Sequence, residues 1–411
     1  MVRLADLPES DREHHLARLK IMPQLAVPKL VSGVSLSQRR VAIITTAGLH
    51  LRGEQAYDGQ GSGIDYRVIP LNTPEKDLVM SHVSVNFDRS GFQADVNVVF
   101  PLDRLKELAS NKVIGSVAKF HYSFMGAIWP ITKYEDKVRA LAALLKQDQV
   151  DAVVLSPVLP LCTCAVSAVG HYLEQEGVAT VQISLIREHT VALKAPRALW
   201  VPFMLGRPFG VPHDAAFQTR VLTEALVLLA RTDGPVLEDF ADDAPTDNLG
   251  QPAQGLTCPV SFPSFKAEGT LATRLADEIS QLQAWHALAQ QAHQKTKLGI
   301  TGCTPAELGA FLSSWLSDSP SLTLKDQSMA PFQAVKFASD ELKTFYYEAK
   351  SVQPGQHSSA SMQHWFWFET TAGEAFLTLR KKFAQEGDPA FAGLATLSMV
   401  PRAVLAELGD S

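Results

Sequence analysis

The alternation of helical and strand-like segments between residues 134 and 185 most constrains the fold of this chain. Residues 134–149 place Val138, Leu141 and Leu145 on one stripe of a helix, and residues 150–156 follow as a short apolar run typical of a buried strand. "AVSAVGHYLEQEG" then predicts a helix that ends at Gly177, and residues 178–185 predict the next strand. With an earlier β-branched strand at residues 40–46, this order predicts a doubly wound α/β fold with a mostly parallel sheet in the N-terminal half.

The C-terminal half has a different character. Residues 232–265 contain six acidic residues, no Lys or Arg, and many Pro and Gly, which favours a linker. Beyond this stretch, apolar residues three and four apart from Leu271 to Trp285, and a helix start at Thr304, predict a mainly helical domain. We therefore expect an N-terminal extension (1–37), an α/β domain (38–231), a linker (232–265) and a helical domain (266–411).

Charge and composition narrow the choice of partners. The net charge of -6 offers no basic face for nucleic acid or an anionic membrane, and the charged N-terminus lacks the apolar core of a signal peptide. Four cysteines in 411 residues do not suggest a disulfide framework. We expect a cytoplasmic protein with a small-molecule substrate and, as further partners, other protein subunits or a thiol reductant.

Polar and reactive side chains follow the predicted strands. His50 comes after the first strand, Cys162 and Cys164 after the strand at 150–156, and Arg187 to His189 after the strand at 178–185. His121 and Ser123 follow "IGSVAKF", which we interpret in the same way. Ligands of doubly wound folds bind at the carboxyl ends of the strands. We expect these residues to face one crevice.

The pair Cys162 and Cys164 admits three interpretations. Both can be small residues buried in a turn, as Cys258 and Cys303 are expected to be in their own surroundings. Either can be a thiolate, because the positive end of the following helix lowers the pKa of a thiol. Together with His121 they can also bind a metal ion such as Cu, Zn or Fe.

Three further motifs carry a resemblance to a known family. "SH" at 81–82, "DVNVVFPLDRLKEL" at 95–108 and "IGSVAKFHYSFMG" at 114–126 resemble the selenoprotein B subunits of the glycine, sarcosine, betaine and D-proline reductases. The likeness extends over residues 38–225. It implies an oxidoreductase subunit that reductively cleaves a carbon–nitrogen bond of an amino acid or amine within a complex. It also implies that a selenocysteine or cysteine stands three residues before a second cysteine.

This chain departs from that pattern, because Leu159 stands three residues before Cys162. Our leading hypothesis is a reductase-like enzyme or subunit with Cys162, Cys164, His121 and His82 as catalytic residues and His50, Ser123 and Asn97 as substrate-binding residues. Cys162 is the expected attacking thiol, since Cys164 points about 200° away on the same helix. A metal-dependent enzyme and a degenerate, non-catalytic subunit remain the alternatives.

The C-terminal half holds one unusual stretch. His357, His364, Trp365, Trp367 and Glu369 lie within thirteen residues. Such an aromatic group is typical of a core or an interface, and the alternative is a lid or second ligand set for the α/β domain.

Overall fold

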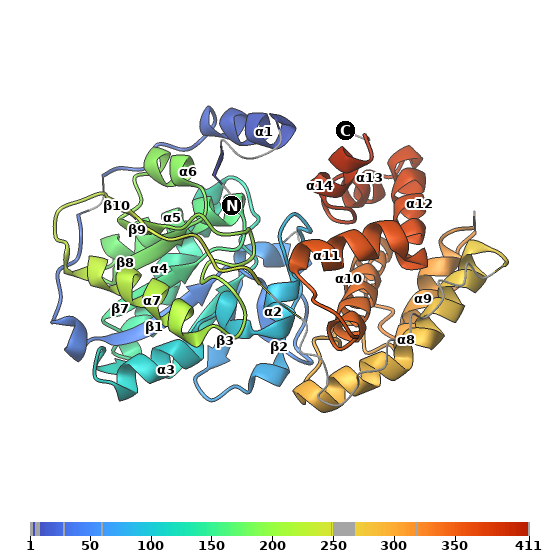
Figure 1. Cartoon of the computed structure of the whole chain (residues 1–411). Helices are drawn as coiled ribbons and strands as arrows, with labels where there is room; N and C mark the ends of the chain where they lie inside the picture. The colour runs from blue at the N-terminus through green and yellow to red at the C-terminus, as the bar shows by residue number, and fades with distance from the viewer. Residues whose placement is uncertain are drawn as a thin grey trace. The chain divides into compact units, whose positions relative to one another are not determined.

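A mostly parallel sheet organises the N-terminal half of the protein (Figure 1). The computed structural model describes residues 3–4, 9–27, 29–58, 61–247, 249, 268–317 and 319–409. In this part of the chain, eight strands form one sheet in the order β10-β9-β8-β7-β1-β6-β3, with β5 beside β1. All the strand pairs are parallel except β3 with β6. The expected doubly wound, mostly parallel α/β fold is confirmed.

The sheet is built from short apolar strands with helices between them. Its strands are β1 (Arg40–Thr45), β3 (Tyr66–Pro70), β5 (Ser116–Val117), β6 (Phe120–Phe124), β7 (Ala152–Ser156), β8 (Ala179–Ser184), β9 (Arg197–Trp200) and β10 (Val236–Asp239). A separate two-stranded sheet pairs β2 (Leu49–Leu51) with β4 (Leu78–Met80). The helices are α1 (Glu9–Leu19), α2 (Ser90–Ala94), α3 (Leu102–Ser110), α4 (Glu135–Gln147), α5 (Pro160–Gln175), α6 (Arg187–Ala192) and α7 (Ala215–Val227).

The two faces of the sheet are covered by different helices. Alternate strand residues such as Ile44 and Tyr122 share a buried apolar cluster with α4 and α5. His121, the neighbour of Tyr122, points to the opposite face and touches the ring of Phe100, just before α3. Because both faces of the sheet are covered, almost every residue of β1 and β7 is buried.

Two sequence expectations need correction. The helix that was expected to begin after the cysteines begins at Pro160, so both cysteines lie inside α5. Proline at the first helical position accounts for this start, because its fixed φ suits a helix and its missing N–H is not needed there. Residues 236–239, assigned to a linker, instead form the edge strand β10 beside β9. Residues 248 and 250–267 of that stretch lie outside the described residues.

The N-terminal segment is joined to the sheet by a buried ion pair. Arg197 in β9 and Glu174 in α5 lie 2.6 Å apart, and both side chains are fully buried. The Glu174 carboxylate accepts the Val31 N–H at 2.6 Å, and Arg197 donates to the Val31 carbonyl at 2.9 Å. A fully buried pair of opposite charges thus fixes the segment that precedes β1.

The chain forms two compact units. The first comprises residues 1–74, 80–83 and 87–245, and the second comprises residues 75–79, 84–86 and 246–411. Two short pieces from the N-terminal half therefore belong to the second unit, which the sequence did not lead us to expect.

The second unit is mainly helical, as predicted. It contains α8 (Leu271–His293), α9 (Pro305–Ser314), α10 (Pro331–Ser351), α11 (Ser359–His364), a π-helical turn (Trp365–Glu369), α12 (Thr371–Gln385), α13 (Pro389–Leu397) and α14 (Arg402–Glu407). Thr304 and Glu307 form the expected capping box of α9. Within the described residues, no helix combines the length and the apolar character needed to cross a membrane.

Candidate functional site

The candidate site lies where the strand order of the sheet changes direction. β1 has β7 on one side and β6 on the other, so the chain moves outward from β1 in both directions. The segments after these three strands meet at one edge. Thr46 follows β1 and donates its N–H to Ser156 at the end of β7, and Gly48 donates to Phe124 at the end of β6. Ligands of doubly wound folds bind at such a switch point, outside the carboxyl ends of the strands.

Cys162 and His82 meet at this edge. The sulfur of Cys162, in the first turn of α5, lies 3.5 Å from Nε2 of His82 and 3.7 Å from the carbonyl oxygen of Thr46. Both side chains are fully buried. The distance of 3.5 Å allows a hydrogen bond between the thiol and the imidazole, so the two groups can exchange a proton.

The environment of Cys162 differs from the sequence expectation. We expected the helix N-terminus to lower the pKa of the thiol, but burial raises the pKa of Cys162 to about 11. The free-energy cost of burying a thiolate away from water is larger here than the stabilisation that the positive end of α5 gives it. Cys162 is therefore a protonated thiol at neutral pH.

Neighbouring residues contact both the backbone and the imidazole ring of His82. Gly48 has a φ of +66°, and a Cβ atom there would lie 3.1 Å from the Cα atom of His82, so the position requires glycine. Arg89 donates to the His82 carbonyl at 2.5 Å, and the ring of Phe87 lies edge-on to the imidazole with centroids 5.0 Å apart. These contacts fix the histidine against the thiol.

Gly126 packs closely against the sulfur of Cys162. Its φ is +78°, and a Cβ atom there would lie 2.7 Å from the Cys162 sulfur and 2.5 Å from the Thr46 Cβ atom. No side chain fits at this position without displacing the sulfur or the strand end. The turn after β6 thus depends on a residue with no side chain and a left-handed backbone.

Cys164 belongs to a different pair. Its sulfur lies 3.4 Å from Nδ1 of His189, which also lies 3.3 Å from the carbonyl of Pro160. Burial raises the pKa of Cys164 to about 12 and lowers the pKa of His189 to about 4. Two positions apart on one helix, the cysteines contact different histidines, and both are free thiols.

His121 and Ser123 lie within β6 rather than after a strand, which corrects our expectation. Nδ1 of His121 accepts the Ile43 N–H at 3.0 Å, so the imidazole takes the place of a backbone acceptor beside β1. Burial lowers the pKa of His121 to about 3. The Ser123 hydroxyl accepts the Leu49 N–H at 2.8 Å. Both side chains bond the backbone of neighbouring segments.

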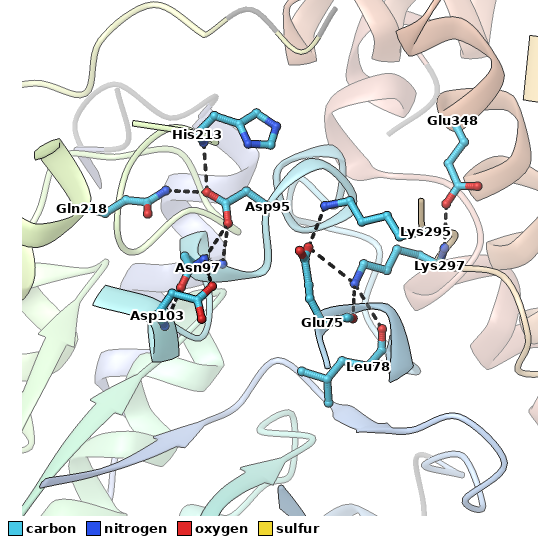
Figure 2. Close-up of polar contacts among 10 residues, drawn as sticks. All are labelled: Glu75, Leu78, Asp95, Asn97, Asp103, His213, Gln218, Lys295, Lys297 and Glu348. Atoms are coloured by element: carbon cyan, nitrogen blue, oxygen red, sulfur yellow. Dashed lines mark hydrogen bonds and ion pairs between the residues drawn. The ribbon is translucent and has the colours of Figure 1, made fainter. Parts of the chain in front are cut away.

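Asn97 takes part in a turn before α3 (Figure 2). Its side-chain amide donates to Asp95 at 2.9 Å and to Asp103 at 3.1 Å, while its oxygen accepts the Asp103 N–H. Asp95 also accepts bonds from the His213 backbone and the Gln218 side chain. These bonds tie α3 to α7.

His50 lies in β2, with Nδ1 3.0 Å from the Leu51 carbonyl. Burial lowers the pKa of His50 to about 4, so the imidazole is neutral at pH 7. Its ring lies edge-on to Tyr57, whose hydroxyl donates to the Ser123 carbonyl at 2.5 Å.

The proposed metal ligands do not form one set. Cys162 contacts His82, Cys164 contacts His189, and His121 accepts the Ile43 N–H. The two cysteines point in different directions because they lie two positions apart on one helix. In the described part of the chain, no group of three or more His, Cys, Asp or Glu side chains is arranged to hold a metal ion. Cys303 is a half-buried free thiol, and Cys258 lies outside the described residues.

The aromatic stretch of the C-terminal half divides among several surroundings. Trp367 is buried beside Phe366 and Phe376. His357 bonds the Gln353 carbonyl at 3.0 Å, and the exposed His364 faces Glu407 at 3.7 Å. The aromatic side chains of this stretch contribute to the core of the helical unit.

Sequence reasoning missed the pairing of Cys164 with His189 and the role of the two glycines. The position of His189 just after β8 marked it for the site, but not as the neighbour of Cys164. Gly48 and Gly126 each follow a strand by two or three residues, but a glycine in a loop does not reveal which side chain approaches it.

Comparison with known proteins shows which proteins the N-terminal half is similar to. The sequence model of the family glycine/sarcosine/betaine reductase selenoprotein B (GRDB) matches residues 13–158. The D-proline reductase subunit gamma of Acetoanaerobium sticklandii is 27% identical over 192 residues, which are 46% of this chain and 78% of that protein. The glycine reductase complex component B subunit gamma of Symbiobacterium thermophilum is 26% identical over 200 residues, 47% of this chain and 46% of that protein.

A third relative shows the same extent of similarity. The sarcosine reductase complex component B subunit beta of Peptoclostridium acidaminophilum is 24% identical over 187 residues, 44% of this chain and 43% of that protein. The chain therefore spans less than half the length of the glycine and sarcosine reductase relatives. No solved structure matches the chain. The N-terminal half of this chain is thus similar to the selenoprotein B subunits of the glycine, sarcosine, betaine and D-proline reductases, as its motifs predicted.

Proposed function

We propose that this chain is a subunit of a reductase complex that acts on an amino acid or a related amine. The relatives of its N-terminal half are named as subunits of glycine, sarcosine and D-proline reductases. The observation that carries the proposal is the 3.5 Å contact between the Cys162 sulfur and His82 Nε2 at the switch point of the sheet.

In this proposal, Cys162 is the reactive thiol and His82 is its proton acceptor. Transfer of the thiol proton to the imidazole produces a thiolate beside an imidazolium, which is how paired Cys and His side chains activate sulfur. The contact lies within hydrogen-bond range, so the proton needs no intervening water.

The reaction we propose is the reductive cleavage of a carbon–nitrogen bond. The bond takes up two electrons and two protons to give one C–H and one N–H bond. A dithiol supplies the electrons and protons and becomes a disulfide. Because Leu159 replaces the thiol or selenol expected three residues before Cys162, a second sulfur has to come from the reductant or from a partner subunit.

A non-catalytic subunit is the second candidate, and one observation favours it. Cys162 is fully buried, and burial raises its pKa to about 11. A thiol in this state reacts slowly, and the chain would then contribute binding surface to a complex instead of chemistry.

The experiment uses the chain purified from its native host together with the proteins that co-purify. Consumption of a dithiol is measured with glycine, sarcosine, betaine and D-proline as substrates. We expect Cys162→Ser and His82→Gln to lower the rate more than about 100-fold, since each removes one member of the pair. Cys303→Ser is the matched control and should retain the wild-type rate.

Two results would count against the proposal. Full activity in Cys162→Ser would remove the thiol mechanism from this chain. Absence of turnover with every substrate and with all co-purifying proteins would favour the non-catalytic subunit.

A further inference from the structure

The chain reaches His82 only through residues of the helical unit. Residues 80–83 belong to the α/β unit, but residues 75–79 before them and residues 84–86 after them belong to the helical unit. Residues 80–83, which carry His82, therefore connect two short segments of the helical unit. We call residues 75–79 the first arm and residues 84–86 the second arm. Whatever fixes these arms also limits where His82 can lie.

The first arm is held by two lysines (Figure 2). Lys297 Nζ donates to the Glu75 carbonyl at 2.8 Å and to the Leu78 carbonyl at 3.3 Å, and its side chain is 2% exposed. Lys295 Nζ lies 2.7 Å from the Glu75 carboxylate. A buried ammonium that donates to two backbone carbonyls fixes the course of the chain, since hydrogen bonds from a charged donor are stronger than those from a neutral one.

The lysines themselves stand on a rigid loop. The Glu348 carboxylate in α10 accepts the Lys297 N–H at 2.6 Å and the Thr296 hydroxyl at 2.7 Å. About two turns earlier in α10, Glu341 accepts the N–H groups of Ile300 at 2.7 Å and Thr301 at 3.0 Å. The loop is thus tied to one long helix by two carboxylates, each with several hydrogen bonds.

The second arm is held at the start of α14. The side-chain oxygen of Asn86 accepts the Arg402 N–H at 2.9 Å. The first N–H groups of a helix lack partners within the helix, so this bond satisfies one of them.

We infer that the helical unit positions His82 against Cys162, with Lys297 as the principal positioning residue. Gly48 and Arg89 hold the His82 backbone from the α/β unit, while Lys297 and Asn86 hold the arms on either side of it. Any change that shifts the loop at 295–301 moves the first arm and so alters the contact of His82 with the thiol. The inference rests on the proposed function only for the role of the pair, and its test needs no substrate.

The test compares Lys297→Met with Lys325→Met in the full chain. Lys325 also donates to a loop carbonyl of the helical unit, that of Gly302 at 3.0 Å, but it contacts neither arm. Two quantities are measured: hydrogen exchange at the Ser81 amide, which donates to the Gly48 carbonyl at 3.0 Å, and the alkylation rate of Cys162 with Cys164 as internal reference.

For Lys297→Met we expect both rates to rise about ten-fold, because the loosened arm lets residues 80–83 open and uncovers the sulfur. The rates of Cys164 and of the Lys325→Met control should stay at wild-type values. Lys297→Arg should restore both rates, since its guanidinium also donates to two carbonyls. If Lys297→Met does not fold, Glu75→Gln and Asn86→Ala weaken the two arms more mildly and replace it.

Three outcomes would overturn the inference. Faster exchange confined to residues 75–79 and 295–301 would make Lys297 purely structural. An equal rise at Cys164 or in Lys325→Met would indicate general loosening. Loss of reductase activity in Cys162→Ser without any effect of Lys297→Met on the two rates would leave the proposed function intact and remove the positioning role.

Discussion

Nε2 of His82 lies 3.5 Å from the sulfur of Cys162, and neither side chain reaches solvent. This distance is within hydrogen-bond range, and the thiol is protonated because burial raises the pKa of Cys162 to about 11. Burial also keeps small reagents in the surrounding water away from the sulfur.

Thiol labelling at neutral pH should modify Cys303 before Cys162 or Cys164. Cys303 is half-buried, whereas the other two are fully buried with raised pKa values. A thiol with a pKa of about 11 is about one part in ten thousand thiolate at pH 7. Peptide-resolved mass spectrometry after alkylation with iodoacetamide gives the rate of each cysteine.

The same labelling in urea is the control. All the cysteines should then react at similar rates, since burial no longer protects them. Rapid labelling of Cys162 in the native protein would contradict this prediction and support the thiolate that the sequence suggested.

Gly126→Ala should destabilise the α/β unit by about 2–4 kcal/mol, through the left-handed φ and overpacking against the Cys162 sulfur. Gly53→Ala is the matched control, because Gly53 also has a positive φ, +88°, but has no atom within 4 Å of an added Cβ. Urea unfolding followed by circular dichroism measures both variants. Equal losses in the two variants would show that contact with the sulfur is unimportant.

Arg197→Met should lower the free energy of unfolding by about 3–5 kcal/mol, because it leaves Glu174 buried without its partner. Lys137→Met, which breaks the exposed ion pair with Asp65, should cost less than about 1 kcal/mol. Thermal and urea unfolding of both variants give the comparison. A small loss in Arg197→Met would mean that Glu174 takes up a proton or that water enters.

Stability should fall as the pH is lowered from about 6.5, because the unfolded chain then binds protons that the folded chain does not. Burial lowers the pKa of His121 to about 3 from 6.5, so its contribution is complete above pH 6.5 and is lost as the pH falls towards 3. Each such histidine gives a slope of about 1.4 kcal/mol per pH unit in this window.

The variant His121→Gln tests this dependence. Its amide oxygen can accept the Ile43 N–H in place of Nδ1, but the side chain does not titrate. Urea unfolding between pH 7 and pH 5 should show a smaller slope than wild type by about 1 kcal/mol per pH unit. An unchanged slope would mean that His121 does not titrate on unfolding in this range.

Much of the fold was predictable from local patterns. The helical stripe of Val138, Leu141 and Leu145, the apolar run before Ser156 and the capping residues Thr304 and Glu307 each led to the element that the structure contains. Such signals depend on neighbours within a few residues, so the sequence displays them directly. The start of α5 was placed too late because the cysteines were interpreted as part of a turn.

The candidate site was predictable only in part. The motif "SH" and the cysteine after β7 marked both His82 and Cys162 as candidate catalytic residues. His121 carried the same signal as His82, yet its imidazole bonds the backbone of β1. The sequence could not separate the two, because a histidine that supports a strand and one that faces a thiol differ only in their spatial neighbours.

The sequence by itself determined the α/β character of the first half, the helical character of the second, and the resemblance to selenoprotein B subunits. Each of these follows from periodicity, capping and short motifs that a linear chain carries. The tertiary structure alone decided that Cys162 meets His82 while Cys164 meets His189, 80 and 25 residues away along the chain. It also decided that the arms around His82 belong to the helical unit, where Lys297 holds the first arm and the Arg402 N–H holds the second. The physical reason is that burial and contacts between distant residues arise only when the sheet closes, and these contacts set the pKa and the partner of each thiol.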